Sequence, residues 1–294
     1  MGAKSAPHQQ DPVVKTAKLA VGHAIGEMPK MPPRENRLHT VDRALRVLTS
    51  FPSDGQDVSL RELSAAVGIE SSVVYRILYT LAEHGVVTKN PSTRRYALGP
   101  RLLELASRGP HLDLRRKALP AMERLARETG ESALLLVCSE GAAVCVEGVE
   151  EVDSPIRYTA RIGNRIPLHV GAGPKVLLAF RPEAEIDAYL RGPLQRFTAN
   201  TLTNPKRVRA ELAKIRAQGY ATSHGEKDLG VTAISAPIRN HSGSVVATLT
   251  LAGPDVHLPA GRVQTLTKVV VETANAVAQE LGFTLKSAKQ AAAL

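Results

Sequence analysis

One helical pattern, a glycine break and a second helical pattern constrain this chain more than any other feature of its sequence. In residues 59–68, Ser59 and Glu62 have the spacing of a capping box, and Gly68 fits the tight turn that follows. The next segment, residues 71–84, starts with small polar residues. Both segments carry apolar residues at helical spacing: Leu60, Leu63, Ala66 and Val67 in the first, and Val74, Ile77, Leu78 and Leu81 in the second. Two short helices joined by a turn that contains glycine predict a helix-turn-helix.

The segments on either side of this pair predict a first helix and a wing. Thr40 is the expected N-cap of a helix over residues 40–48. Two strands are expected at residues 86–89 and 95–98, with a turn-rich loop at residues 90–94 between them. The three helices and the two-stranded wing together predict a winged helix-turn-helix domain.

This predicted domain carries a local cluster of basic residues. Residues 89–101 hold four basic residues and no acidic one. In such a fold, the start of the second helix of the pair meets base edges, and the wing approaches a phosphate or the minor groove. We therefore expect DNA contacts from Ser71, Ser72, Tyr75 and Arg76 on the helix and from Arg94 and Arg95 on the wing. The alternatives are a winged helix used only for protein contacts, packing of Tyr75, and an internal ion pair of Arg76.

The overall charge supports a polyanionic partner only weakly. The net charge is +10, but residues 1–110 carry 15 basic and 10 acidic residues and residues 111–294 carry 23 and 18, so the excess is not concentrated in one half. The only cysteines, Cys138 and Cys145, make no disulfide framework and are expected to be buried free thiols, which suits a reducing cytoplasm. No apolar run approaches the roughly 18 residues that a membrane helix needs, and no secretion signal is evident. We therefore expect a cytoplasmic protein of about two domains, with no membrane partner.

From residue 100 the pattern changes, first to helices and then to alternating strands and helices. A linker helix over residues 100–108 and a longer helix over residues 112–128 are expected, with a kink or a restart at Pro120. Further strands are predicted at residues 133–137, 143–146, 156–160, 220–223, 233–238 and 245–251, and helices at residues 175–180, 183–190, 205–218 and 260–281. This pattern is typical of an α+β domain with an antiparallel sheet.

The expected organisation has five parts. They are a disordered arm at residues 1–38, the winged helix-turn-helix at 39–100, a linker helix at 101–111, the α+β domain at 112–283 and a flexible tail at 284–294. The arm contains five prolines and few large apolar residues. A DNA contact through Lys30, Arg34 or Arg37 is the alternative role for this arm.

Several segments, taken in order, resemble the IclR-type family of transcriptional regulators. They lie at residues 40–45, 60–69, 95–102, 166–175, 219–226 and 236–254, and the resemblance covers residues 39–283. It implies a winged helix-turn-helix joined by a helix to a GAF-like effector domain. It also implies dimers, often paired into tetramers, that bind palindromic operators in double-stranded DNA. Members respond to small organic acids or aromatic compounds, and we expect this chain to be a repressor.

The resemblance also implies a set of effector-binding residues. Ala172 and Gly173 match backbone donors at the start of a helix, where N–H groups can bind a carboxylate. The remaining matches are the polar contacts Ser223 and Thr250 and the pocket walls Tyr158, Ile166, Val231, Ala233 and Ala252. Because several of these side chains are small, we expect a roomy pocket that suits an aromatic or larger acid. The alternative is that these residues are ordinary core.

No catalytic residue, cofactor or metal is expected. The sequence has no nucleophile elbow, no phosphate-binding glycine-rich loop and no HExxH motif. His224, Glu226 and Asp228 superficially resemble metal ligands, but no fourth ligand lies at a suitable spacing. His169, beside the predicted pocket, is expected to be structural. The alternative function is an enzyme that converts a small molecule and carries the winged helix for regulation.

Overall fold

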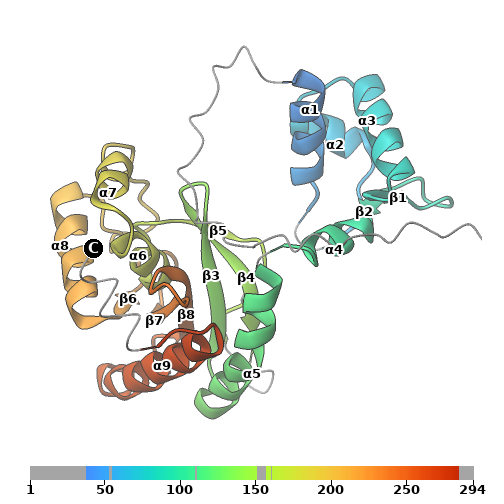
Figure 1. Ribbon diagram of the computed structural model, residues 1–294. Coiled ribbons are helices and arrows are strands. Elements are labelled where there is room, and N and C mark those ends of the chain that lie inside the picture. Colours follow the sequence, from blue (N-terminus) through green and yellow to red (C-terminus); the bar gives the residue numbers. More distant parts are fainter. Residues whose placement is uncertain (1–37, 53–54, 110, 151–156, 160, 285–294) are drawn as a thin grey trace, which may run out of the picture.

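The computed structural model describes residues 38–52, 55–109, 111–150, 157–159 and 161–284. Figure 1 shows two groups of elements, a small helical one and a larger one built around a sheet. The arm predicted at residues 1–38 and the tail predicted at 284–294 lie almost entirely outside the described residues. Within the described residues, no helix combines the length and the apolar character needed to cross a membrane.

The small group is the predicted winged helix-turn-helix. Its elements are α1 (His39–Thr49), α2 (Leu60–Val67), α3 (Ser71–Glu83), β1 (Val87–Lys89) and β2 (Tyr96–Leu98). The apolar stripes of the three helices meet in one core, together with residues of the wing. The most deeply buried members are Val47, Leu63, Val74, Leu78 and Val87. This unit therefore has a hydrophobic core of its own.

The predicted capping signals hold for α2 and fail for α1. The Ser59 hydroxyl accepts the Glu62 N–H at 3.3 Å, and the Glu62 carboxylate accepts the Ser59 N–H at 2.7 Å, so the capping box is confirmed. Gly68 ends α2 with a φ of 65°, a conformation that favours glycine. The prediction of Thr40 as the N-cap of α1 is wrong. The helix already begins at His39, and Leu38 at the N-cap position offers no polar side chain.

The wing is held by the Asn90 side chain and by a close backbone approach at its base. The Asn90 amide oxygen accepts the N–H groups of Ser92 and Thr93, which closes the loop. At the base, a Cβ on Gly99 would lie 2.1 Å from the carbonyl oxygen of Gly85. Only glycine therefore allows β2 to leave the wing along this path.

Two helices lead from the wing to the sheet. They are α4 (Arg101–Ala106) and α5 (His111–Thr129). Helix α5 contains Pro120 but continues as one helix, so the restart considered for this position does not occur. The buried face of α5 includes Leu114, Ala118 and Leu125.

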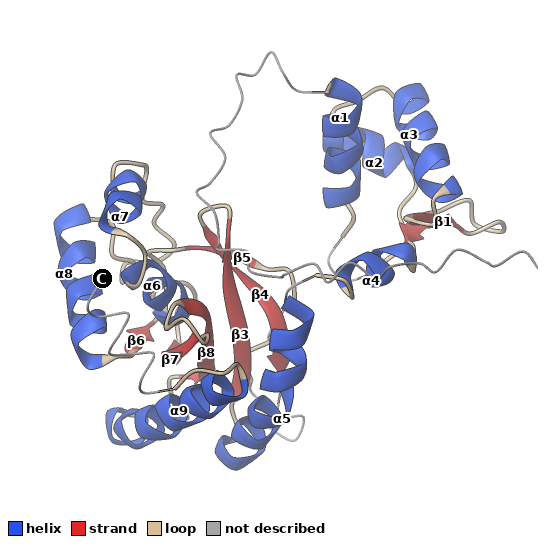
Figure 2. Cartoon of the chain, viewed as in Figure 1, coloured by secondary structure: helices blue, strands red, loops and turns tan. Residues whose placement is uncertain are grey.

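The large group contains a six-stranded antiparallel sheet (Figure 2). Its strands are β3 (Ser132–Ser139), β4 (Ala142–Val149), β5 (Arg165–Pro167), β6 (Ala221–His224), β7 (Val231–Arg239) and β8 (Val245–Pro254). They lie in the order β5-β4-β3-β8-β7-β6. The α+β fold class with an antiparallel sheet is therefore confirmed.

The strands at one edge of the sheet differ partly from the prediction. The β3–β4 hairpin turns at Glu140 and Gly141, whose φ values are 49° and 74°, between the strands predicted at residues 133–137 and 143–146. The strand predicted at residues 156–160 is wrong, because residues 157–159, the part of it that is described, are not in a strand. The edge position beside β4 is taken instead by β5, which no strand prediction covered.

Helices cover both faces of the sheet (Figure 1). Helices α5 and α9 (Ala260–Glu280) pack on one face, and α6 (Ala172–Ala179), α7 (Glu183–Leu190) and α8 (Pro205–Gln218) lie on the other. Strand β3 contributes to both cores: Leu135 belongs to the α5 side, and Leu134 and Leu136 to the α6 side. Because side chains alternate along a strand, a strand covered on both faces is apolar throughout.

Candidate DNA-binding surface and effector pocket

The start of α3 is exposed and is shaped by short serine contacts. The Ser71 hydroxyl donates to the Ser64 hydroxyl at 3.0 Å, and the Ser64 hydroxyl donates to the Ile69 carbonyl at 2.5 Å. The Ser72 hydroxyl donates to the Glu70 carboxylate at 2.8 Å. Ser71 and Ser72 therefore help to fix the turn between α2 and α3 while remaining on the surface.

Tyr75 and Arg76 follow on the same exposed part of α3. Tyr75 is 46% exposed, so it does not pack into the core. The Lys89 ammonium of β1 lies 5.9 Å from the centre of its ring. Arg76 is exposed, and among the described residues it forms no ion pair. Lys89 extends the basic surface from α3 to the wing, a position that its place in the basic cluster of residues 89–101 did not indicate.

The two wing arginines have different surroundings. Arg94 is exposed in the loop and has a φ of 57°. Arg95 is half-buried: its Nε donates to the Asp57 carbonyl at 2.9 Å and its Nη2 to the Glu62 carboxylate at 2.8 Å. Hydrogen bonds from Ser59, together with the Arg95 charge, lower the pKa of the Glu62 carboxyl. Arg95 thus joins the wing to the start of α2, whereas Arg94 faces solvent.

A pocket lies where the start of α6 meets the sheet. All nine predicted effector residues line it: Tyr158, Ile166, Ala172, Gly173, Ser223, Val231, Ala233, Thr250 and Ala252. Its volume is about 50 Å³, which is room for about three or four water molecules. The pocket is therefore smaller than the roomy one expected. The larger side chains of Tyr158 and Lys227 also line it, besides the small residues on which that expectation rested.

The first turn of α6 presents backbone rather than side chains to the pocket. Gly171, at the N-cap, has a φ of 82°, and no side chain caps the helix. The N–H groups at such a helix start favour an anion. Gly173 is needed for packing, since a Cβ there would lie 2.5 Å from Leu136 Cδ1 and 2.6 Å from Thr250 Oγ1. The missing side chain thus lets α6 approach the sheet.

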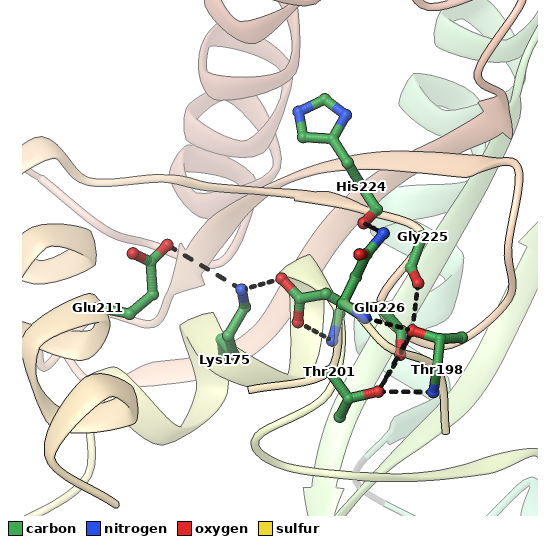
Figure 3. Close-up of polar contacts among 9 residues, drawn as sticks. Lys175, Thr198, Thr201, Glu211, His224, Gly225 and Glu226 are labelled. Carbon is green, nitrogen blue, oxygen red and sulfur yellow. Dashed lines mark hydrogen bonds and ion pairs between the residues drawn. The ribbon is translucent and has the colours of Figure 1, made fainter. Parts of the chain in front are cut away.

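A buried ion pair fixes the loop after β6 to α6 (Figure 3). The Glu226 carboxylate accepts the Lys175 ammonium at 2.5 Å and the Gly171 N–H at 3.0 Å. Glu211 lies on the other side of the Lys175 ammonium, at 4.0 Å. This pair could not be predicted, because nothing in a single sequence links residues so far apart.

The backbone of the same loop is held by two threonines. The Thr198 hydroxyl donates to the Gly225 carbonyl at 2.6 Å, and the Thr201 hydroxyl donates to the Glu226 carbonyl at 2.7 Å. Figure 3 shows both threonines beneath the loop. Residue 226 is therefore anchored through its backbone as well as through its side chain.

The three residues that superficially resembled metal ligands have separate partners. His224 Nδ1 lies 2.9 Å from the Thr232 hydroxyl, Glu226 pairs with Lys175, and Asp228 pairs with Lys227 at 3.2 Å. Within the described residues, no group of three or more histidine, cysteine or acidic side chains could hold a metal ion.

His169 and Cys145 are buried in the sheet domain, and Cys138 is half-buried. His169 is buried, with Nδ1 2.7 Å from the Tyr189 hydroxyl and Nε2 3.0 Å from the Gln195 carbonyl, and burial lowers its pKa. The structural interpretation of His169 is therefore confirmed. Both cysteines are free thiols, and burial raises the pKa of Cys145 to about 11, so this thiol is not a ready nucleophile. Cys145 is buried as predicted, whereas Cys138 is only half-buried.

Two family models match the chain. The IclR helix-turn-helix domain matches residues 40–91, and the bacterial transcriptional regulator IclR C-terminal domain matches residues 109–279. The first match covers the three helices and the start of the wing, and the second covers the sheet and its helices.

Curated relatives and solved structures agree with these matches. The HTH-type transcriptional regulator XynR of Escherichia coli (strain K12) is 34% identical over 220 residues, which are 73% of this chain and 86% of that protein. The DNA-binding transcriptional repressor YiaJ of the same organism is 28% identical and covers 92% of this chain and 97% of its own length. The crystal structure of an IclR homolog complexed with 4-hydroxybenzoate, from Microbacterium hydrocarbonoxydans, is 28% identical with a TM-score of 0.75, and covers 82% of this chain and 98% of that one.

The fold and the comparisons agree over both halves of the chain. The winged helix-turn-helix matches one family model, and the antiparallel sheet with its helices matches the other. The relatives are named as regulators, which agrees with the expectation that this chain is not an enzyme. The chain belongs to the IclR family of bacterial transcriptional regulators.

Proposed function

We propose that this protein is a cytoplasmic repressor that binds a palindromic operator as a dimer and releases it when a small organic acid enters the pocket. The observation that carries the effector part is that the nine residues implied by the family resemblance all line one pocket beside the start of α6, where no side chain caps the helix. The five-part division at residues 38, 100, 111 and 283 remains part of this proposal. Repression is supported by relatives that are named as repressors.

The DNA-binding part of the proposal assigns different roles to the six predicted residues. The start of α3 enters the major groove, where Ser71, Ser72, Tyr75 and Arg76 meet bases and phosphates. Arg94 binds a phosphate or enters the minor groove from the wing. Arg95 acts indirectly, because its two internal hydrogen bonds hold the wing in position.

The effector part assigns the carboxylate of the acid to the N–H groups at the start of α6. Ser223 and Thr250 supply polar contacts, and the apolar walls take the hydrocarbon part of the acid. The solved relative with bound 4-hydroxybenzoate supports an aromatic acid. Since the pocket is only about 50 Å³, an aromatic acid needs its wall to open further than a two-carbon acid does.

Dimerisation is supported by an exposed apolar stripe. Leu38, Val41 and Leu45 are 75%, 51% and 56% exposed and follow the helical spacing along α1. Leu103 on α4 is also 75% exposed. A second copy of the chain that covers this stripe would remove it from water, which is favourable.

An electrophoretic mobility shift with the promoter DNA beside the protein's own gene tests the proposal. The assay is run at two salt concentrations with excess competitor DNA, and organic acids are then added. We expect a specific shift that weakens with salt and is abolished by one class of acid. A specific shift that no acid alters would contradict the effector part alone, and the absence of any specific shift would contradict the DNA-binding part.

A further inference from the structure

Lys227 places a positive charge in the wall of the effector pocket. Its side chain lines the cavity and is 25% exposed. The ammonium lies 3.2 Å from the Asp228 carboxylate and also contacts the Tyr158 hydroxyl. Burial lowers the pKa of Lys227, but the neighbouring Tyr158 and Asp228 outweigh this effect and raise the pKa overall. Lys227 is therefore a charged side chain at neutral pH.

Lys227 is the side chain of the pocket wall that can offer a positive charge to a ligand. Glu226 also lines the cavity, but it is 9% exposed and is held by the Lys175 ammonium and the Gly171 N–H. Among the described residues that line the pocket, Lys227 is the one basic side chain. Its partner Asp228 is 48% exposed, so the Asp228 carboxylate can be hydrated when it leaves the ammonium.

A carboxylate ligand in this pocket needs a full positive charge. The N–H groups at a helix start are equivalent to roughly half an elementary charge. The pocket wall already holds the carboxylates of Glu226 and Asp228. Glu226 is already paired with Lys175, but without Lys227 an incoming anion would be repelled by the unpaired Asp228 carboxylate as it lost its hydration shell.

We propose that the Lys227 ammonium binds the anionic group of the effector, which replaces the Asp228 carboxylate as the partner of Lys227. This inference rests on the proposed function, because it assumes that the pocket takes an organic acid. It goes further by assigning the selection of anions over neutral molecules of the same shape to one side chain. It also makes Asp228 an internal competitor of the ligand.

Because Asp228 competes with the ligand, removing the Lys227 charge and removing the Asp228 charge should change the affinity for an acid in opposite directions. Replacing Lys227 with methionine removes the charge and keeps most of the side-chain length, so it should weaken binding of an acid. Replacing Asp228 with asparagine removes the competing anion, so it should strengthen binding of the same acid. If the ion pair only stabilised the pocket wall, both variants would change the affinity for the acid in the same direction.

The test uses the full chain and isothermal titration calorimetry. Benzoate, 4-hydroxybenzoate, pyruvate and succinate are titrated first, and any acid that binds is compared with its primary amide. The variants are Lys227→Met, Lys227→Arg and Asp228→Asn. The control is Lys206→Met, which removes an exposed lysine at the start of α8.

We expect Lys227→Met to weaken binding of the acid by about 10-fold to 100-fold, the range for a hydrogen bond to a charged group. Lys227→Arg and Lys206→Met should bind it about as well as the original chain, and Asp228→Asn should bind it more tightly. Equal binding by Lys227→Met, or equal binding of acid and amide by the original chain, overturns the inference and leaves the effector proposal intact. Failure of all four acids to bind the original chain counts against both.

Discussion

Lys175 and Glu226 form an ion pair in which the two side chains are only 1% and 9% exposed, although 51 residues separate them in the sequence. Removing one member of a buried pair leaves an uncompensated charge away from water, at a cost of about 3–5 kcal/mol. We therefore expect Lys175→Met to lower the free energy of unfolding in urea by about that amount. The double variant Lys175→Met, Glu226→Gln should recover part of the loss.

An exposed ion pair provides the control for this prediction. Arg116 and Asp113 are 77% and 51% exposed, so Arg116→Gln should change the free energy of unfolding by less than about 1 kcal/mol. A Lys175→Met variant that unfolds at the same urea concentration as Arg116→Gln would show that the buried pair contributes no more to the free energy of unfolding than the exposed one.

The two wing arginines should separate in function. Arg94→Ala should weaken binding to specific and non-specific DNA alike and reduce the salt slope of log K by about 0.9, because it removes one phosphate contact. It should leave stability unchanged. Fluorescence anisotropy with labelled DNA at several salt concentrations measures the slope.

Unlike Arg94→Ala, the variant Arg95→Ala should lower the stability of the chain. It removes hydrogen bonds to Asp57 and Glu62, so the winged helix should unfold at a lower urea concentration. Any loss of DNA affinity should then follow the loss of fold. An Arg95→Ala variant as stable as the original chain, with the salt slope of Arg94→Ala, would instead assign Arg95 to a phosphate.

Gly173 should tolerate no side chain. In Gly173→Ala the new methyl group would lie 2.5 Å from Leu136 Cδ1 and 2.6 Å from Thr250 Oγ1, so α6 must move away from the sheet. We expect a loss of about 1–3 kcal/mol in the free energy of unfolding and a loss of acid binding. Gly261→Ala, where the methyl group meets open space in α9, should not destabilise the chain. Equal stability of the two variants would contradict this account of Gly173.

The exposed stripe on α1 should control association. Leu45→Glu places a charge in the stripe and should shift the chain from dimer to monomer in size-exclusion chromatography with light scattering. Leu229→Glu is the matched control, because Leu229 is 73% exposed and lies in the loop after β6. A Leu45→Glu variant that elutes with the same mass as the original chain would remove the stripe from the proposed interface.

The buried carboxyl of Glu131 should make stability depend on pH. Burial raises its pKa, and the charges of His257 and Arg262 lower it by less. A carboxyl whose pKa is higher in the folded chain stabilises the fold fully below its unfolded pKa, and this contribution is lost as the pH rises through the folded pKa. Glu131→Gln should therefore flatten the fall of unfolding free energy with rising pH. Urea unfolding of both chains between pH 4 and pH 7 measures it, and parallel curves would contradict the assignment.

Elements with local signals at their ends could be predicted from the sequence almost residue by residue. Helix α8 starts after Asn204, whose side chain accepts the N–H groups of Lys206 and Arg207, and it ends at Gly219 with a φ of 80°. Both signals are local, so the prediction of residues 205–218 agrees with the structure. Strand β5 has only three residues and depends on pairing with β4, and no local pattern indicated it.

Part of the pocket could likewise be predicted from the sequence, and part could not. Its nine predicted residues came from a resemblance that spans the chain, and the structure brings all nine together. The charged residues around them were not predicted as a group. Lys175, Glu226 and Lys227 have their roles through packing between α6 and the loop after β6, and a single sequence carries no record of that contact.

Strand β3 separates the effector pocket on one face of the sheet from the core that contains α5 on the other. Leu134 and Leu136 line the pocket, and Leu135 between them packs in the core that includes α5, the helix that follows the DNA-binding unit and α4 along the chain. Neighbouring residues of one extended strand cannot shift independently. The proposed effector site and the core that contains α5 are therefore separated by the thickness of a single strand.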